Sequence, residues 1–382
     1  MKEFKVALIG GGGFMGHTHS MALSLAPLIA DAGFTVTKQT LVDATDEVAS
    51  AAAAKLGWNS SSTDWRSVIA DPDIDAIDIV TPPPLHEEIA VAALAAGKHV
   101  FCEKPLANDL ASAQRMAAAA ASSAGVSTQV GFNYRHISAV QHIKALVERG
   151  DLGDVLQFRG TYLQDPLFFF DSFGWRGSKK TGGSGAVGDI GSHVLDLAEY
   201  ICGPIVRVSA STRSLTRRVD ARRTWADADE VREDERLDDS GVWVAEFASG
   251  AMGTFAVSFV SYGRKNRLTF EIDGERGSVD FDWNRPGEFQ LGLESDAPDA
   301  SGMKSVIVSG AHPDVWYPVA GLAQGYLDAS AAQFAHFFGA IAAGTPTAPD
   351  FAVAAHTQAI VAAVTLSAER GGWVDVGEVS AS

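Results

Sequence analysis

Three side chains in two short motifs have the chemistry to take a proton from an alcohol. Glu103-Lys104-Pro105 supplies an ammonium group, and Gly188-Asp189-Ile190-Gly191-Ser192-His193 supplies a carboxylate and an imidazole. An ammonium group stabilises a developing alkoxide. An imidazole accepts a proton at pH 7, because its ordinary pKa lies near neutrality. Together these groups would remove the hydroxyl proton. The alcohol would be oxidised if a further group took a hydride from the same carbon.

A glycine-rich loop near the start of the chain indicates where a dinucleotide would bind. An apolar strand is predicted over residues 4–9 and a helix over 15–28, and between them Gly11, Gly13 and Gly16 satisfy G-x-G-x-x-G. Glycines permit a tight turn and a close approach of backbone to a pyrophosphate at the helix N-terminus. The extra glycine in this run leaves the register open by one position. A glycine-rich turn without a ligand is the alternative, which the flanking strand and helix disfavour.

A carboxylate after the second predicted strand favours NAD over NADP. The strand covers residues 36–42 and ends at Asp43, which would accept hydrogen bonds from ribose hydroxyls and repel a 2′-phosphate. No Arg or Lys follows in residues 44–47 to balance such a phosphate. Asp43 lies 27 residues after Gly16, so the first helix or its loop carries an insertion. The alternative interpretation is a turn or helix-capping carboxylate.

The first 130 residues alternate strand and helix. Further strands are predicted over residues 75–80, 98–102 and 126–130, and helices over residues 46–56, 86–96 and 108–124, the last capped by Asn108 or Asp109. This alternation predicts an α/β domain with a doubly wound parallel sheet. Ligands bind at the carboxyl ends of such strands, where Gly11, Asp43, Thr81 and Lys104 all fall.

The remaining chain predicts an α+β domain with a large, mainly antiparallel open sheet. The expected strands cover residues 155–163, 205–213, 241–247, 251–260, 267–272, 278–283 and 288–293, and the expected helices 136–149, 185–200, 326–343 and 351–368. The charged stretch Arg217 to Asp239 is expected to be a solvated loop. The predicted division is therefore residues 1–131 and 132–382.

Composition excludes several classes of protein. With 46% hydrophobic and 20% charged residues among 382, the chain reads as a globular protein. A formal charge of −17 disfavours a nucleic-acid partner. The two cysteines, Cys102 and Cys202, imply no disulfide framework. No signal peptide and no membrane-spanning apolar run were expected, so the predicted location is the cytoplasm.

The second motif is predicted to form a helix over residues 188–201. Asp189 and His193 would then lie on one face, about 6 Å apart, because residues four apart are neighbours on a helix. Asp189 would orient the imidazole or bind a substrate hydroxyl. Taken singly, a packed histidine, a surface lysine and a simple Asp–His pair are the more ordinary interpretations. No third ligand at a recognisable spacing accompanies the pair, so no metal site is predicted.

The order of the motifs resembles the Gfo/Idh/MocA family, the relatives of glucose–fructose oxidoreductase and inositol dehydrogenase. The matching pieces are Ile9 through Gly16 with His19, Thr81-Pro82-Pro83 with His86, Glu103-Lys104-Pro105, Gly131 through Arg135, and Gly183 through His193 with Asp196. Residues 13–20 and 160–165 look most similar to dehydrogenases of sugars, anhydrosugars and inositols.

The resemblance implies a Rossmann domain that binds NAD and a second domain that binds substrate and forms a homodimer or homotetramer through its open sheet. It implies that Lys104, Asp189 and His193 are catalytic. Besides the glycines and Asp43, the implied cofactor contacts are Phe14, Met15, Thr81, Pro82, His86, Glu103 and Lys104. The implied substrate contacts are Lys104, Asn133, Tyr162, Asp189 and His193. From its own position, His86 is expected to be structural or to stand behind the site.

Aromatic residues between the first strand of the second sheet and the Asp189 helix are candidates for sugar recognition. The Trp175 ring would stack on sugar C–H surfaces, and Arg176 would donate hydrogen bonds to sugar hydroxyls. The phenylalanines Phe168 to Phe170 and Phe173 would either line the cleft or pack in the core. Gln164 and Asp165 are further candidate hydroxyl ligands.

The sequence therefore predicts an NAD-dependent dehydrogenase that oxidises a secondary hydroxyl of a sugar, anhydrosugar or cyclic polyol to a ketone. Either His193 or Lys104 would accept the proton. Two other functions are open: a glycosidase or epimerase that keeps tightly bound NAD and uses hydride transfer only transiently, and a non-catalytic sensor of sugar or NAD. A sensor would be expected to lack one of the three catalytic groups.

Overall fold

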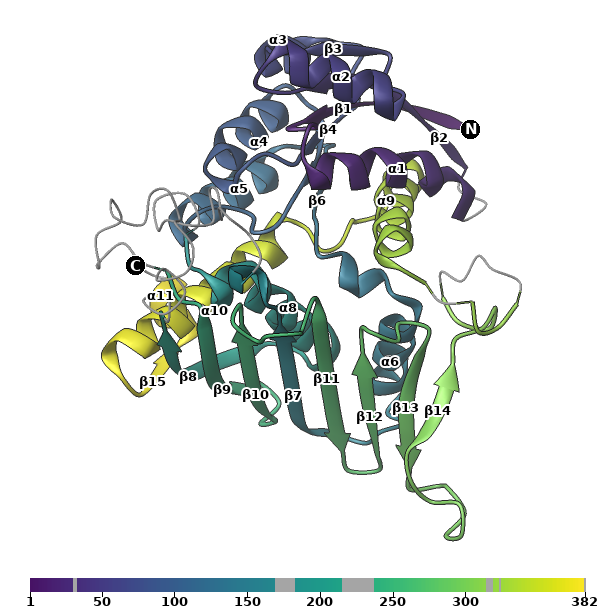
Figure 1. The fold of residues 1–382 in the computed structure, drawn as a ribbon, viewed down its shortest axis with the longest axis vertical. Coiled ribbons are helices and arrows are strands. Elements are labelled where there is room, and N and C mark those ends of the chain that lie inside the picture. Colours follow the sequence, from purple (N-terminus) through teal and green to yellow (C-terminus); the bar gives the residue numbers. More distant parts are fainter. Residues whose placement is uncertain (30–32, 169–182, 215–236, 314–318, 323, 381–382) are drawn as a thin grey trace. The chain divides into compact units, whose positions relative to one another are not determined.

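The computed structural model describes residues 1–29, 33–168, 183–214, 237–313, 319–322 and 324–380 (Figure 1). The chain folds into two compact units. Unit 1 consists of Met1–His136 and Gln324–Ala355, and unit 2 of Ile137–Ala323 and His356–Ser382. Unit 1 therefore includes a late segment that the division into residues 1–131 and 132–382 did not assign to it.

Unit 1 is built on a parallel six-stranded sheet with the strand order β3-β2-β1-β4-β5-β6. Its strands are β1 (Lys2–Ile9), β2 (Phe34–Val42), β3 (Ser60–Ser62), β4 (Ala76–Ile79), β5 (His99–Cys102) and β6 (Thr128–Val130). This order is that of a Rossmann sheet and confirms the predicted doubly wound α/β fold. The three-serine strand β3 was missed because it carries no apolar pattern.

Helices and short turns connect these strands. They are α1 (Phe14–Ile29), α2 (Asp46–Leu56), α3 (Trp65–Ala70), α4 (His86–Ala95) and α5 (Leu110–Ser122), with 3-10 turns η1 (Pro83–Leu85) and η2 (Asn133–His136). Capping sets several of their ends. The Thr45 side chain accepts the Val48 N–H at the start of α2, and Gly57, with φ 74°, ends that helix. Of the two residues expected to cap α5, the structure selects Asp109.

A helix from the end of the chain completes the core of unit 1. Helix α9 (Tyr326–Ala343) lies against α1 (Figure 1). Its Phe338 packs on Phe4 of β1, with ring centroids 4.9 Å apart, and on Phe34 of β2 at 5.8 Å. The sequence assigned this helix to the second domain, because a strand–helix pattern does not show that a later segment returns to cover an earlier sheet.

Unit 2 is built on a nine-stranded sheet with the order β14-β13-β12-β11-β7-β10-β9-β8-β15 (Figure 1). Its strands are β7 (Val155–Leu163), β8 (Ile205–Arg213), β9 (Ser240–Phe247), β10 (Met252–Ser258), β11 (Arg267–Gly274), β12 (Gly277–Asp282), β13 (Glu288–Leu293), β14 (Lys304–Ile307) and β15 (Trp373–Asp375). Among the strand pairs that the structure describes in this sheet, only β7–β10 is parallel. The predicted mainly antiparallel sheet is confirmed, and the short strands β14 and β15 were missed.

Among the described residues, helices cover one face of this sheet and leave the other open. The covering elements are α6 (Ser138–Glu148), a π-helical turn η5 (Val187–Gly191), α8 (Ser192–Cys202) and α10 (Phe351–Arg370), while η3 (Pro166–Phe168) and α11 (Val376–Ser380) flank the sheet. On β9, Trp243 and Ala245 are buried, whereas Val242, the residue before Trp243, is 53% exposed. This period of two is what a sheet covered on one face requires.

Helix α10 departs from one sequence expectation. In the described part of the chain it is the one helix long and apolar enough, by length and composition, to cross a membrane. Within its 18-residue apolar window, 61% of the residues are buried inside the fold. Burial in the protein accounts for the apolar composition of this helix.

Candidate active site

The glycine-rich loop between β1 and α1 has the backbone that a phosphate cradle needs. Gly10 has a φ of +95°, and a Cβ there would lie 2.8 Å from the Thr81 nitrogen. A Cβ on Gly16 would overlap the carbonyl oxygen of Gly11, so the helix start and the loop touch. A Cβ on Gly13, by contrast, would meet nothing within 4 Å. Gly10 therefore makes the tight turn, although the predicted motif was placed on Gly11, Gly13 and Gly16. The backbone at Gly13 is open to a ligand.

Asp43 follows β2 and faces the same loop. One carboxylate oxygen accepts the Gly12 N–H at 2.7 Å and the other accepts the Ala44 N–H at 2.7 Å. A Cβ on Gly12 would lie 2.9 Å from the Asp43 carboxylate, so this glycine is required for the contact. The structure thus ties the loop to the residue predicted to select NAD.

The segments after β4 and β5 meet at His86. Its ring nitrogens lie 2.8 Å from the Thr81 oxygen and 3.1 Å from the Pro105 oxygen. The side chain is buried, and burial lowers the pKa of the imidazole more than the carbonyl contacts raise it. Both nitrogens face backbone carbonyl oxygens, a packed position that fits the expected structural role of His86, and the cofactor contact stays a prediction. The buried Thr81 hydroxyl has no hydrogen-bond partner among the described residues.

Glu103 and Lys104 follow β5 directly. One Glu103 oxygen accepts the Lys104 N–H at 3.2 Å, and the other lies 3.3 Å from Nε2 of His19. Pro82 starts the 3-10 turn after β4. The predicted cofactor residues of unit 1 thus follow the carboxyl ends of β1, β2, β4 and β5, as the sheet topology requires.

His19 of α1 joins Glu103 to a buried carboxylate. Its Nδ1 lies 3.0 Å from both oxygens of Asp78 on β4. Burial lowers the pKa of the His19 imidazole, but the charge and hydrogen bond of Asp78, together with Glu103, outweigh burial and raise that pKa to about 10. Burial raises the pKa of the Asp78 carboxyl, against the opposing effect of His19. The raised pKa keeps His19 an imidazolium at neutral pH, hydrogen-bonded to Asp78, and sequence reasoning assigned neither residue a role.

The other predicted residues of unit 1 lie near α9. Phe14, at the start of α1, is 72% exposed and its ring lies 6.1 Å from that of Tyr326. Tyr326 also donates to the sulfur of Met15 at 3.6 Å. Asn133 in η2 is buried and donates to the Ser330 hydroxyl at 3.2 Å, while its Oδ1 has no partner in the described residues. The contacts predicted for these three residues with cofactor or substrate stay predictions.

Asp189 and His193 lie in unit 2, at the junction of η5 and α8. The predicted continuous α-helix is wrong over its first turn, because residues 187–191 are π-helical and Asp189 lies within that widened turn. Asp238 holds this turn through its carboxylate, which accepts the Val187 N–H at 2.9 Å and the Gly185 N–H at 3.1 Å. Such turns frequently mark functional sites. Asp238 is the penultimate residue of the stretch Arg217 to Asp239 that was predicted to be a solvated loop, and its buried carboxylate departs from that prediction.

The end of β7 contributes a hydrogen-bonded group beside His193. The rings of Tyr162 and His193 lie 5.9 Å apart, and both side chains are buried. Tyr162 Oη donates to Asn266 Oδ1 at 2.6 Å, and Gln164 Nε2 donates to the same oxygen at 2.7 Å. No sequence signal marks Asn266, which is distant along the chain from both partners.

Asp165 is already bound within unit 2. Its buried carboxylate accepts the Gly263 N–H at 2.8 Å and pairs with the Lys265 ammonium at 2.9 Å. These contacts fix the loop before β11, so the structure favours a positioning role for Asp165 over the predicted hydroxyl contact. Trp175 and Arg176, with Phe169, Phe170 and Phe173, lie outside the described residues.

The structure thus groups the predicted residues by unit. Lys104 and the cofactor residues belong to unit 1, whereas Tyr162, Gln164, Asp165, Asp189 and His193 belong to unit 2. Among the described residues, no three His, Cys, Asp or Glu side chains are grouped so that they could hold a metal ion.

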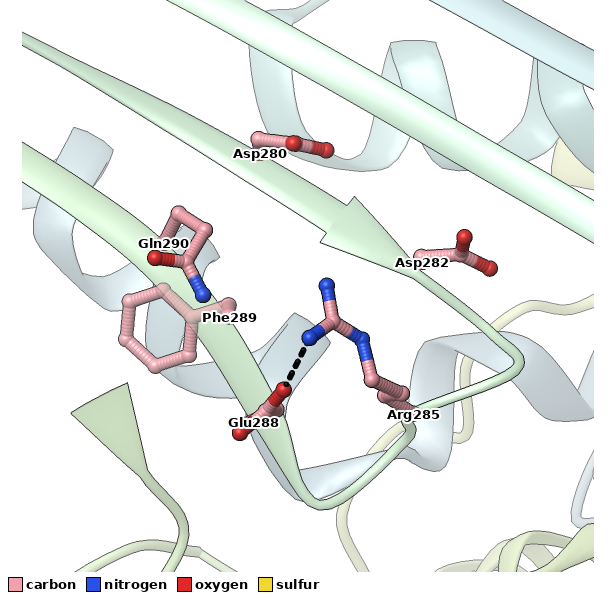
Figure 2. A pocket seen from close by; sticks show the side chains of 6 residues that line it. All are labelled: Asp280, Asp282, Arg285, Glu288, Phe289 and Gln290. Carbon is pink, nitrogen blue, oxygen red and sulfur yellow. Dashed lines mark ion pairs between the residues drawn. The ribbon is translucent and has the colours of Figure 1, made fainter. Parts of the chain in front are cut away.

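A recess on the open face of the unit 2 sheet contains none of these residues. Figure 2 shows its lining: Asp280, Asp282, Arg285, Glu288, Phe289 and Gln290. Arg285 pairs with Glu288 at 2.9 Å, and Asp280 and Asp282 are the other charged residues of the lining. Burial, followed by Glu271 and Asp282, raises the pKa of Asp280.

Two family models match consecutive parts of the chain. The one described as an oxidoreductase family with an NAD-binding Rossmann fold matches residues 4–132, and the one described as a GFO/IDH/MocA C-terminal domain matches residues 140–280. The chain belongs to the Gfo/Idh/MocA oxidoreductase family. It is an NAD-dependent oxidoreductase that acts on the CH–OH group of its substrate.

Individual relatives differ in how much of the chain they match. Levoglucosan dehydrogenase from Pseudarthrobacter phenanthrenivorans is 38% identical over 392 aligned positions that cover 100% of both chains. Inositol 2-dehydrogenase from Mycolicibacterium gilvum is 30% identical over 53% of each chain. A solved structure of levoglucosan dehydrogenase in complex with NADH and levoglucosan superposes with a TM-score of 0.92 at 38% identity, covering 98% of this chain and 100% of that one.

The residues present fit NAD. The backbone at Gly13 is open, α1 begins directly after this loop, and the Thr81 hydroxyl, which has no partner among the described residues, follows β4. Gly11, Gly13 and Gly16 would hold the pyrophosphate, and Asp43 the adenosine ribose.

Proposed function

We propose that this enzyme oxidises a secondary hydroxyl of an anhydrosugar of the levoglucosan type to a ketone. The observation that carries the proposal is the extent of similarity. The match to levoglucosan dehydrogenase spans all of both chains, including unit 2, whereas the match to inositol 2-dehydrogenase covers 53% of this chain. Because substrate identity in such a fold depends on the second domain, similarity throughout unit 2 supports the same substrate class.

The catalytic groups act on the substrate hydroxyl. Bound NAD supplies the hydride acceptor. The Lys104 ammonium stabilises negative charge on the hydroxyl oxygen as its proton leaves, and a neutral His193 imidazole accepts that proton. Asp189 orients the imidazole or binds a neighbouring hydroxyl. In the other assignment Lys104 is the base and His193 is a substrate ligand. Tyr162, whose ring lies 5.9 Å from that of His193, would limit how the imidazole turns.

The substrate is tested with a panel of polyols. Purified enzyme is incubated with NAD and, separately, levoglucosan, myo-inositol, D-apiose and glucose 6-phosphate, and NADH absorbance is followed. We expect the largest kcat/KM with levoglucosan. A larger value with myo-inositol would transfer the proposal to the cyclic polyols.

The same assay distinguishes a dehydrogenase from an enzyme that transfers the hydride to tightly bound NAD only transiently. A dehydrogenase releases one NADH for each ketone formed. A glycosidase or epimerase with tightly bound NAD converts substrate without accumulating NADH in solution, so product measured by chromatography would exceed NADH by many turnovers.

We also propose that the enzyme is a cytoplasmic homodimer or homotetramer that assembles through the open face of the unit 2 sheet. On this face Val242, Ala256 and Thr161 stand opposite one another on β9, β10 and β7 and form an uncharged stripe. Both cysteines are free, which suits a reducing compartment. Light scattering should show a multiple of the chain mass, and Val242→Asp, which places a charge in the stripe, should yield monomers. A wild-type monomer would refute the assembly.

A further inference from the structure

The side chain of Glu103 is tightly packed inside unit 1. Its side chain is 10% exposed. A Cβ on Gly131, the residue after β6, would overlap the Glu103 carboxylate. The Gly131 N–H in turn donates to the Cys102 oxygen at 2.9 Å, so the strand ends of β5 and β6 are fixed to each other here. Gly131 therefore provides the space into which Glu103 turns.

The partner that Glu103 reaches in this space is His19. The imidazole stands between two carboxylates, with Nδ1 at 3.0 Å from Asp78 and Nε2 at 3.3 Å from Glu103. Its remaining surroundings are apolar, because Phe101 of β5 and Phe334 of α9 meet the ring edge-on at 5.5 and 5.1 Å. Asp78 and Glu103 are thus the charged groups that face His19 from the elements packed around it.

The charges of this cluster do not cancel. One imidazolium and two carboxylates leave one net negative charge, and the pKa of His19, raised to about 10, keeps the cation in place at neutral pH. Asp78 alone would satisfy the imidazolium. The second carboxylate, Glu103, is also the one whose other oxygen accepts the Lys104 N–H. The buried neighbours His86 and Cys102 are neutral, since burial lowers the pKa of the His86 imidazole and raises that of the Cys102 thiol.

We propose that His19 is a positioning residue for Lys104. Its imidazolium fixes the Glu103 carboxylate, and Glu103 fixes the backbone from which the Lys104 ammonium extends to the substrate hydroxyl. Asp78 keeps the imidazole charged and orients its ring. The proposal rests on the function proposed above, in which Lys104 is a catalytic residue, and it assigns the cluster of His19, Asp78 and Glu103 to the geometry of that reaction.

Three variants test this role. His19→Gln removes the cation, leaving two facing carboxylates, and should lower kcat by about 10²-fold, the cost typical of a misplaced catalytic group. His19→Gln with Asp78→Asn restores one net negative charge and should recover at least half of that loss on a logarithmic scale. Lys98→Met is the matched control: it removes a buried cation at the opposite end of β5, where Lys98 donates to the Asp71 and Ile74 oxygens at 2.7 Å. It should lower Tm and leave kcat unchanged.

The pH profile adds a readout that packing alone would not move. In His19→Gln the two carboxylates repel, so one of them takes up a proton as pH falls. The kcat of this variant should therefore rise relative to wild type toward lower pH, and this rise should vanish in the double variant. If His19→Gln does not fold, Glu103→Gln, which keeps the shape and loses the charge, replaces it and should show the same fall in kcat.

NAD affinity, measured by fluorescence titration, should stay within about threefold of wild type in the His19, His19–Asp78 and Lys98 variants. A folded His19→Gln enzyme with wild-type kcat, or a double variant no better than the single one, would overturn the proposal. The charge of His19 is measured separately by NMR titration of the wild-type ring, which should remain protonated at about pH 9. A neutral ring there overturns the inference even if the sugar assay succeeds. An inactive wild type with a protonated His19 refutes the proposed function instead.

Discussion

The two units hold their functional side chains in different ways. In unit 1 backbone contacts fix the glycine-rich loop, because Gly10 and Gly16 allow approaches that a Cβ would block, and the side-chain cluster of His19, Asp78 and Glu103 lies beside Lys104. In unit 2 the positioning comes from side chains distant along the chain, since Asn266 holds Tyr162 and Gln164 and Asp238 holds the π-helical turn. Substitutions in unit 1 should therefore act on cofactor binding and hydride transfer. Those in unit 2, apart from the catalytic Asp189 and His193, should act on substrate placement.

The largest expected effect is that of Lys104→Ala. Loss of one electrostatic group at a developing oxyanion typically lowers the rate about 10²–10³-fold. We expect this fall in kcat with NAD affinity retained, measured by steady-state kinetics and fluorescence titration. Near wild-type kcat would place Lys104 on the cofactor side or at the surface.

His193 should set the acid limb of the oxidation profile. If its imidazole accepts the hydroxyl proton, kcat/KM falls about tenfold per pH unit once pH drops below the ring's pKa. In His193→Gln, which cannot take up a proton in this range, the limb should disappear. A mutant in which KM rises and the acid limb survives would favour Lys104 as the base.

Asp43 should give a preference for NAD over NADP of at least about tenfold in kcat/KM, or 1.4 kcal/mol. The reason is that no cation in residues 44–47 balances a 2′-phosphate beside this carboxylate. Kinetics with both cofactors measures it, and Asp43→Ser should narrow the ratio. A preference for NADP would remove Asp43 from the cofactor site.

Asn266→Ala tests whether the side-chain network of unit 2 positions substrate. It removes the acceptor shared by Tyr162 and Gln164, and loss of such a hydrogen bond typically costs about 1 kcal/mol, roughly a fivefold effect. We expect KM for the sugar to rise while NAD affinity stays constant. A change in NAD affinity instead would contradict the expectation that side chains of unit 2 place the substrate and those of unit 1 bind the cofactor.

The smallest expected effect is on stability, from His356 and Glu199. Their atoms lie 3.0 Å apart, and the Glu199 hydrogen bond raises the pKa of His356 above 6.5. A raised folded-state pKa contributes stability that is full below about pH 6.5 and is lost as pH rises through the folded value. The histidine is 43% exposed, so screening limits the contribution to about 1 kcal/mol or less. The Tm difference between wild type and His356→Gln should shrink between about pH 6 and 9.

The same contrast explains what could be predicted from the sequence. Local patterns gave β7, β8, β13 and α9 their correct bounds, and strand ends located Asp43, Thr81 and Lys104. Tight turns require glycines and buried strands require apolar runs, and both patterns are visible in the sequence. A hydrogen bond from Tyr162 to Asn266 joins residues 104 positions apart and leaves no such pattern. Likewise, nothing in residues 187–191 indicates that Asp238 would widen their turn.

The return of α9 to unit 1 affects how this protein is made. During synthesis the strands of the Rossmann sheet leave the ribosome first, but Phe4 and Phe34 find their partner Phe338 only after most of the chain has followed. Until then an apolar surface of the nascent unit stays uncovered, where chaperones and other nascent chains can bind it. A fragment cut after residue 131 would keep that surface for good, so a soluble cofactor-binding fragment has to carry residues 324–355 as well.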